Sequence, residues 1–144
     1  MNFKITLFLL AIFFYGCGKD NVVPNIQFEV IIDLKDPKYS NKDVFSLVDV
    51  EDLFTGAKIR AGYSGVIVCK SASFIAFEKY CPHDRSSSCN VSIKSDETTK
   101  ALCNCCKTEY LLFTGEVVHG ESKYGLKEYK TQHLINQNFL RIWN

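Results

Sequence analysis

Two short cysteine-rich segments constrain this chain more than any other feature of its sequence. Residues 80–85 read Tyr-Cys-Pro-His-Asp-Arg, and residues 102–110 read Leu-Cys-Asn-Cys-Cys-Lys-Thr-Glu-Tyr. The first contains a C-x-H spacing and the second a C-x2-C spacing. Closely spaced soft ligands on two facing loops are how proteins build four-coordinate, sulfur-rich metal sites. Seven cysteines in 144 residues is also a high density, which predicts disulfides, a metal site or both.

The charge of the chain argues against a nucleic-acid partner. Seventeen basic and sixteen acidic residues give a formal net charge of +1, and no clustered basic face is visible. Aromatic and β-branched residues are plentiful, so the chain can form a packed core. No G-x-S-x-G segment, phosphate-binding glycine loop or nucleophile–base pair is visible, so nothing in the sequence indicates a hydrolase or another stand-alone enzyme.

The N-terminal residues predict export. One positive charge precedes a continuous apolar run over residues 5–15, which suits a signal-peptide core and is too short to span a bilayer as a helix. The run ends at Gly16-Cys17, which resembles the lipobox of bacterial lipoproteins. The resemblance implies a signal peptide over residues 1–16, acylation of Cys17 and a lipid-anchored tether over residues 17–25. The domain is then held at a membrane of the bacterial envelope, outside the cytoplasm; the alternative is an ordinary signal peptide.

The rest of the chain shows short strands separated by turn residues, with no helical repeat of convincing length. The expected strands are residues 26–33, 44–50, 65–70, 74–78, 101–103, 110–113, 126–131 and 139–143. Residues 65–70 and 74–78 form a predicted hairpin. Many short strands at this spacing predict an all-β fold, an antiparallel sandwich or small barrel, in one domain over residues 26–144.

The two cysteine-rich segments resemble the two boxes of the Rieske family, which read C-x-H and C-x2-H. Cys81 and His83 match the first box, and Cys103 and Cys106 align with the second, where Cys106 replaces the family's second histidine. The resemblance covers most of residues 26–144, although only the two boxes are specific. It implies a base of antiparallel strands and a smaller lobe, made of the two loops, that binds a [2Fe–2S] cluster.

The same resemblance implies a ligand set and a function. Cys81 and Cys103 would hold an inner iron, and His83 and Cys106 an outer one; a set of three cysteines and one histidine is chemically reasonable because thiolate is a good iron ligand. Such a protein is expected to be a one-electron carrier or redox sensor. In that role the exposed edge of His83 faces a redox partner.

Residues around the ligands also follow the family. There a serine hydroxyl reaches a bridging sulfide and a tyrosine hydroxyl reaches a cysteine ligand, and Thr108 and Tyr110 stand at those positions. Lys107 replaces a glycine and is expected to offset part of the negative charge of the site. Respiratory members join their two loops by a disulfide, whose second partner aligns with Cys105. The first partner aligns with Ser86, so Cys89 is the nearest substitute.

Two alternatives remain open at the level of the sequence. Thiols oxidise outside the cytoplasm, and the six cysteines after Cys17 permit complete pairing. The signal also lacks the paired arginines used by folded, cluster-loaded proteins that leave the cytoplasm. The first alternative is therefore a metal-free lipoprotein, stapled by disulfides, that keeps the Rieske fold and binds an envelope partner. The second is structural zinc on the same three cysteines and one histidine.

Overall fold

The computed structural model describes residues 22–144. The predicted signal peptide over residues 1–16 and Cys17, the predicted site of acylation, lie outside the described residues. The described part of the chain is all-β, as predicted, and within it there is accordingly no helical segment of the length and apolar character that a membrane crossing requires. The strands are β1 (Glu29–Asp33), β2 (Val44–Leu47), β3 (Asp49–Glu51), β4 (Lys58–Arg60), β5 (Val66–Lys70), β6 (Phe74–Glu78), β7 (Val91–Ile93), β8 (Lys100–Cys103), β9 (Glu109–Leu111), β10 (Val117–His119), β11 (Glu128–Leu134) and β12 (Phe139–Trp143).

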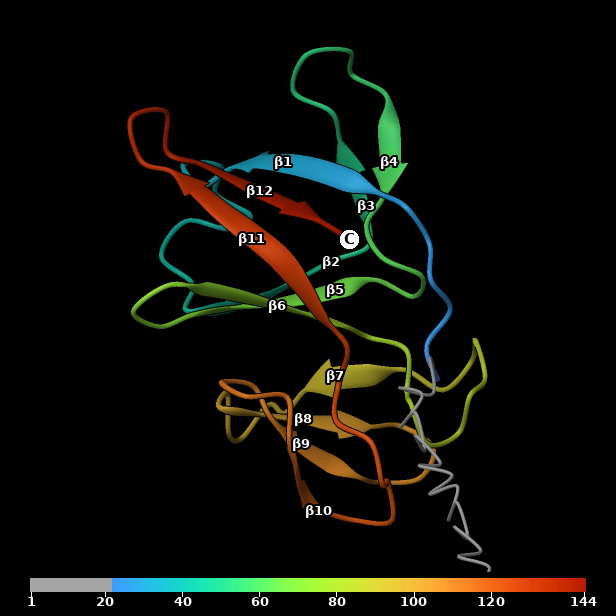
Figure 1. The fold of residues 1–144 in the computed structure, drawn as a ribbon. Helices are drawn as coiled ribbons and strands as arrows, with labels where there is room; N and C mark the ends of the chain where they lie inside the picture. The colour runs from blue at the N-terminus through green and yellow to red at the C-terminus, as the bar shows by residue number, and fades with distance from the viewer. Residues whose placement is uncertain (1–21) are drawn as a thin grey trace, which may run out of the picture.

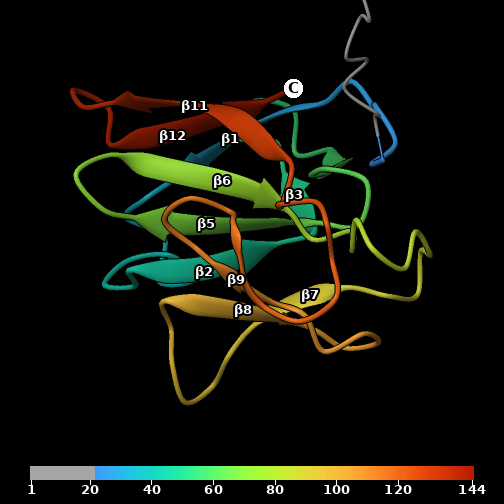
Figure 2. The same cartoon turned by 60° about the horizontal axis from the view of Figure 1, so that its bottom comes forward.

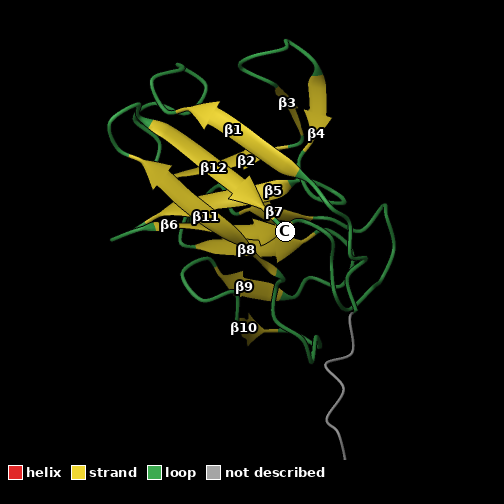
Figure 3. Cartoon of the chain, turned by 45° about the horizontal axis from the view of Figure 1, so that its top comes forward, coloured by secondary structure: helices red, strands yellow, loops and turns green. Residues whose placement is uncertain are grey.

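The strands form two main antiparallel sheets. Six of them make a curled sheet in the order β1-β12-β11-β6-β5-β2, which Figures 1 and 3 show from two directions. Four more, in the order β10-β9-β8-β7, make a smaller sheet, called the lobe here, below the curled sheet in Figure 1. Strands β3 and β4 pair as a separate hairpin. The lobe therefore contains a sheet of its own in addition to the two cysteine-rich loops that the sequence predicted.

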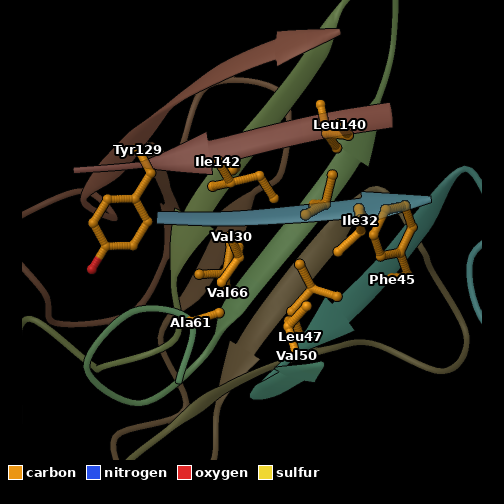
Figure 4. Packing of buried hydrophobic residues seen from close by; sticks show 12 residues of the cluster. Val30, Ile32, Phe45, Leu47, Val50, Ala61, Val66, Tyr129, Leu140 and Ile142 are labelled. Carbon is orange, nitrogen blue, oxygen red and sulfur yellow. The ribbon is translucent and has the colours of Figure 1, made fainter. Parts of the chain in front are cut away.

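Strand β5 is buried on both faces and joins two hydrophobic cores. Val66 and Val68 point into the core inside the curled sheet, whereas Ile67 and Cys69 belong to the core between that sheet and the lobe, because successive side chains of a strand point to opposite faces. Figure 2 shows β7 and β8 of the lobe below β5 and β2, and Val91 and Ala101 of these lobe strands share the second core with Ile67. Figure 4 shows the first core, which includes Val30, Ile32, Phe45, Leu47, Val50, Ala61, Val66, Tyr129, Leu140 and Ile142.

The strand predictions hold best where the apolar pattern is longest. The hairpin predicted over residues 65–70 and 74–78 is confirmed as β5 and β6. The single strand predicted over residues 44–50 is wrong: it is divided at the exposed Val48 into β2 and β3, and β3 pairs with β4 instead. Strands β4, β7 and β10 were missed, because strands of three residues show too little alternation to be recognised.

A buried carboxylate, that of Glu78, ties several segments to the end of β6. Its Oε1 accepts hydrogen bonds from the backbone N–H groups of Ser64 at 2.8 Å and Tyr80 at 2.9 Å. Its Oε2 accepts from the N–H of Tyr63 and from the Tyr129 hydroxyl, both at 2.6 Å. Burial, followed by the neighbouring carboxylate, raises the pKa of Tyr129 well above its usual range, so the hydroxyl stays protonated and donates. These four donors offset the cost of burying the carboxylate.

We expect Glu78→Gln to lower the free energy of unfolding by about 2–4 kcal/mol. The amide replaces an acceptor oxygen by a donor that faces buried N–H groups. Denaturant unfolding followed by circular dichroism measures the change. Glu128→Gln, on the exposed side of β11, is the matched control and should change stability by less than about 0.5 kcal/mol. Equal unfolding midpoints for the two variants would contradict the role of Glu78.

Candidate metal centre

Three loops meet at one end of the lobe, on its right side in Figure 1. The first loop (residues 79–90) connects β6 to β7, the second loop (residues 104–108) connects β8 to β9, and the third loop (residues 120–127) connects β10 to β11. The Asn90 N–H donates to Asn104 Oδ1 at 2.9 Å, which links the first loop to the second. The Ser122 N–H donates to Thr108 Oγ1 at 3.3 Å, which links the third loop to the second.

A disulfide between Cys89 and Cys105 joins the first loop to the second. It confirms the predicted disulfide between Cys89 and Cys105. Cys89 forms it although the family's first partner aligns with Ser86. Cys81, Cys103 and Cys106 stay free in the same region, so the loop cysteines are not all paired with one another.

The three free thiols converge with one carboxylate. The ligand atoms of Cys81, Asp84, Cys103 and Cys106 all lie within 4.8 Å of one another; these four residues are called the Cys3Asp group below. Cys81 Sγ lies 3.7 Å from Cys106 Sγ, and Cys103 Sγ lies 3.2 Å from Asp84 Oδ2. Cys81 and Cys103 are fully buried, whereas Cys106 is partly exposed. The group has the donor atoms and the spacing to hold a metal ion.

A turn in the first loop places the carboxylate of this group. Residues 82–84 form the turn, and the Arg85 N–H donates to the Cys81 carbonyl at 3.2 Å to close it. The turn brings Asp84 back to the side on which Cys81 lies. Asp84 Oδ2 then accepts a hydrogen bond from the Cys106 N–H at 3.2 Å, across to the second loop. The Asp84 carboxylate is therefore held against the second loop by the Cys106 N–H and by the thiol of Cys103, the last residue of β8.

The protonation states of the group follow from burial and hydrogen bonding. Burial raises the pKa of the Cys81 thiol and raises that of Cys103 well above its usual range. For Asp84 burial raises the pKa, but hydrogen bonds from the thiols of Cys103, Cys106 and Cys81 outweigh it, so the pKa is lowered. Without a metal, the protonated thiol of Cys103 thus donates to the ionised carboxylate of Asp84. A metal that binds must displace the thiol protons.

Two hydroxyls lie beside the free thiols. Thr108 Oγ1 is 3.2 Å from Cys106 Sγ, and the Tyr110 hydroxyl is 3.8 Å from Cys81 Sγ. Both side chains are fully buried, and burial raises the pKa of Tyr110, so its hydroxyl remains a donor. These two groups are placed to donate hydrogen bonds to thiolate sulfurs, which is the usual way in which neighbouring residues tune a thiolate-bound metal.

Lys107 occupies a backbone conformation that favours glycine. Its φ is 60°, in the left-handed region, where a non-glycine residue costs about 1–2 kcal/mol. Its Nζ donates to the Asn104 carbonyl at 2.5 Å, and the side chain is exposed. The ammonium is therefore bound to the backbone of its own loop.

His83 is separate from the Cys3Asp group. Its side chain is exposed, and its ring nitrogens are not among the ligand atoms that converge. Asp84, the next residue, takes the fourth place, and the sequence analysis missed it. One sequence feature could have indicated Asp84: a carboxylate three residues after Cys81, in a segment where Pro82 favours a turn. The C-x-H spacing drew attention to the histidine instead.

Comparisons of the chain with protein-family models, with curated proteins and with solved structures found no match. The Rieske resemblance therefore rests on the residues of the two boxes.

The arrangement fits the [2Fe–2S] cluster of that resemblance only in part. A two-iron cluster divides its ligands between irons that bridging sulfides hold apart, so ligand atoms on different irons lie farther apart than those on one ion. Cys106, which the resemblance assigns to the outer iron, lies only 3.7 Å from the sulfur of Cys81, assigned to the inner iron. The thiols are suitable ligands, but this separation is that of two ligands on one ion rather than on two irons.

Loss of the disulfide should destabilise the lobe. The bond closes a loop between residues 16 apart in sequence, and cross-links of this kind are worth about 2–4 kcal/mol. We expect Cys89→Ala/Cys105→Ala to lower the free energy of unfolding of the metal-free protein by that amount. Dithiothreitol should do the same to the unaltered protein and nothing further to the double variant. An unfolding midpoint that is insensitive to dithiothreitol would show that the disulfide is absent or does not change the stability.

Replacing Lys107 by glycine should stabilise the metal-free protein. Lys107→Gly removes the left-handed strain and is expected to raise the free energy of unfolding by about 0.5–1 kcal/mol, after the added flexibility of the unfolded chain is counted. Lys123→Gly is the control, because Lys123 is also exposed but has a negative φ, and it should lower stability by a similar amount. Denaturant unfolding measures the free energy of unfolding of both variants. Changes of the same sign would contradict the strain assigned to Lys107.

Proposed function

We propose that this domain is a one-electron carrier or redox sensor whose metal centre is iron bound by thiolates between the first and second loops. The observation that carries the proposal is the convergence of three free thiols, Cys81, Cys103 and Cys106, beside a disulfide that occupies the other two loop cysteines. Thiolate-rich sites select iron, zinc or copper(I) over hard cations. Bound iron would supply one-electron chemistry, which zinc cannot.

The burial of the thiols supports this role. Cys81 and Cys103 are fully buried beside Tyr110 and Val91, in the core between the curled sheet and the lobe. Cys106 is partly exposed at the end of the lobe. A metal at this position is shielded from water on its inner side and approaches the surface on its outer side. Electron transfer to a docked partner requires such a short path to the surface and needs no substrate pocket.

The surroundings of the site agree with a partner-facing end. His83 and Arg85 are exposed on the first loop, and the Arg85 guanidinium lies 5.6 Å from the ring centroid of Tyr124 on the third loop. These side chains lie on the first and third loops, which are hydrogen bonded to the second loop that carries Cys106. With a lipid on Cys17, the domain would present this end to a redox partner at a membrane of the bacterial envelope.

A second candidate function is a metal-free, disulfide-stapled module that binds an envelope partner. One observation favours it. The Cys103 thiol donates to Asp84 and the Cys106 thiol donates to Thr108, so these thiols have hydrogen-bond partners without a metal. In this case the Cys89–Cys105 disulfide alone fixes the loops.

The deciding measurement is the metal content of the chain purified without oxygen from its native envelope. We expect at least one iron per chain and a visible absorption that changes on reduction. Cys106→Ser should lose most of the iron, whereas Cys69→Ala should retain it, because Cys69 is a free cysteine on β5 outside the group. Two irons with two sulfides would identify the [2Fe–2S] form that the resemblance implies. Zinc alone would indicate a structural site, and neither metal would favour the metal-free module.

A further inference from the structure

We propose that the centre is a single metal ion held by Cys81, Asp84, Cys103 and Cys106, with the Asp84 carboxylate as its fourth ligand. This inference rests on the proposed metal-binding function and goes further, because it assigns both the number of ions and the ligand set. Neither the three-cysteine, one-histidine set nor the two-iron cluster predicted from the sequence contains Asp84.

Two distances within the group are close to the edges of one coordination tetrahedron. A tetrahedral ion with metal–sulfur bonds of about 2.3 Å places two sulfurs about 3.8 Å apart, and Cys81 Sγ lies 3.7 Å from Cys106 Sγ. With a metal–oxygen bond of about 2.1 Å, the sulfur–oxygen edge is about 3.6 Å; Cys103 Sγ lies 3.2 Å from Asp84 Oδ2. All four ligand atoms lie within 4.8 Å of one another. Shifts of the ligand atoms by about 1 Å or less would bring all the distances to those of a tetrahedron around one ion.

Asp84 is held in the ligand position by groups other than the thiols. The turn over residues 82–84 aims it inward, and the Cys106 N–H donates to its Oδ2 at 3.2 Å. A ligating carboxylate is commonly fixed by such an additional hydrogen bond. His83 lies in the same turn but is exposed, outside the converging ligand atoms. To bind there, its imidazole would have to displace the carboxylate that the turn already presents.

The charge of the set restricts the ion. Three thiolates and one carboxylate carry four negative charges, so a divalent ion leaves a net charge of −2. The Cys106 N–H donates to Asp84 Oδ2. Once the thiols are deprotonated, the Thr108 and Tyr110 hydroxyls, which lie 3.2 Å from Cys106 Sγ and 3.8 Å from Cys81 Sγ, are placed to donate to these sulfurs and stabilise the charge. Three soft sulfurs and one oxygen in a tetrahedron suit iron(II) or zinc, whereas magnesium and calcium require more oxygen ligands.

Cobalt(II) is the probe that tests this assignment, because it takes the same tetrahedral geometry and is visible. The full chain, with its disulfide intact, is freed of metal without oxygen and titrated with cobalt(II) alone. We expect saturation at one ion per chain, ligand-field bands of a tetrahedral ion, and sulfur-to-cobalt charge-transfer absorbance for three thiolates. Saturation at two ions per chain, or an octahedral spectrum, would overturn the proposal.

Variants of neighbouring residues identify the fourth ligand. Asp84→Asn keeps the size of the side chain and should weaken cobalt binding at least tenfold. His83→Ala, the matched control in the same turn, should leave stoichiometry, spectrum and affinity unchanged within about twofold. Asp84→Cys should restore binding and raise the charge-transfer absorbance by about a third, as the count of thiolates rises from three to four. If Asp84 acted only in folding, Asp84→Cys would not raise the charge-transfer absorbance.

The outcomes separate this inference from the proposed function. Iron that depends on His83, survives Asp84→Asn and comes with sulfide would overturn the single-ion assignment and leave the electron carrier in place. One cobalt ion that depends on Asp84, together with zinc and no iron in the native protein, would support the site and overturn the carrier. A wild-type chain that remains folded by circular dichroism and binds neither metal would overturn both.

Discussion

The buried carboxylate of Glu78 is the constraint on which the rest of the structure depends. It is the last residue of β6, three residues before Cys81, and its four hydrogen bonds reach the loop before β5, the strand β11 and the start of the first loop. An unpaired carboxylate in this core would cost several kcal/mol. These segments therefore cannot separate one at a time. The position of Cys81 is fixed by a hydrogen-bond network that lies outside the candidate metal centre.

The hairpin of β5 and β6 extends this coupling to the lobe. Its side chains alternate between the core of the curled sheet and the core under the lobe, with Val68 and Ala76 on one side and Ile67 and Phe77 on the other. The buried thiols of Cys81 and Cys103 belong to the second core. The ligands are thus carried by packed structure and held in place before any metal arrives, which lowers the entropic cost of binding.

The sequence predicted the features that depend on local pattern, and it missed those that depend on the path of the chain. The continuous apolar run of β5, the hairpin turn after it and the loop cysteines can all be recognised in the sequence itself. Strand β7 is too short to show a pattern, and it is defined by its pairing with β8. Asp84 looks like a solvated loop residue until the turn directs it at Cys103, because a carboxylate becomes a ligand candidate only through its neighbours in space. The disulfide partner Cys89 came from the family resemblance, since pairing cannot be deduced from spacing alone.

The disulfide decides which thiols remain for a metal. Cys105 and Cys106 are adjacent in the chain, and four or more mobile thiols in one place would exchange partners freely. With Cys105 bonded to Cys89, three thiols stay in the group, and an odd number cannot pair completely. The fourth member of the group, Asp84, has a carboxylate, which does not oxidise. A group made of three thiols and one carboxylate therefore resists closure into disulfides better than four thiols would, which is an advantage in the oxidising envelope that the N-terminal sequence predicts. The same reasoning explains how three free thiols can persist beside a structural disulfide: the bridge removes the competing partner, and the carboxylate would complete the coordination of the proposed ion.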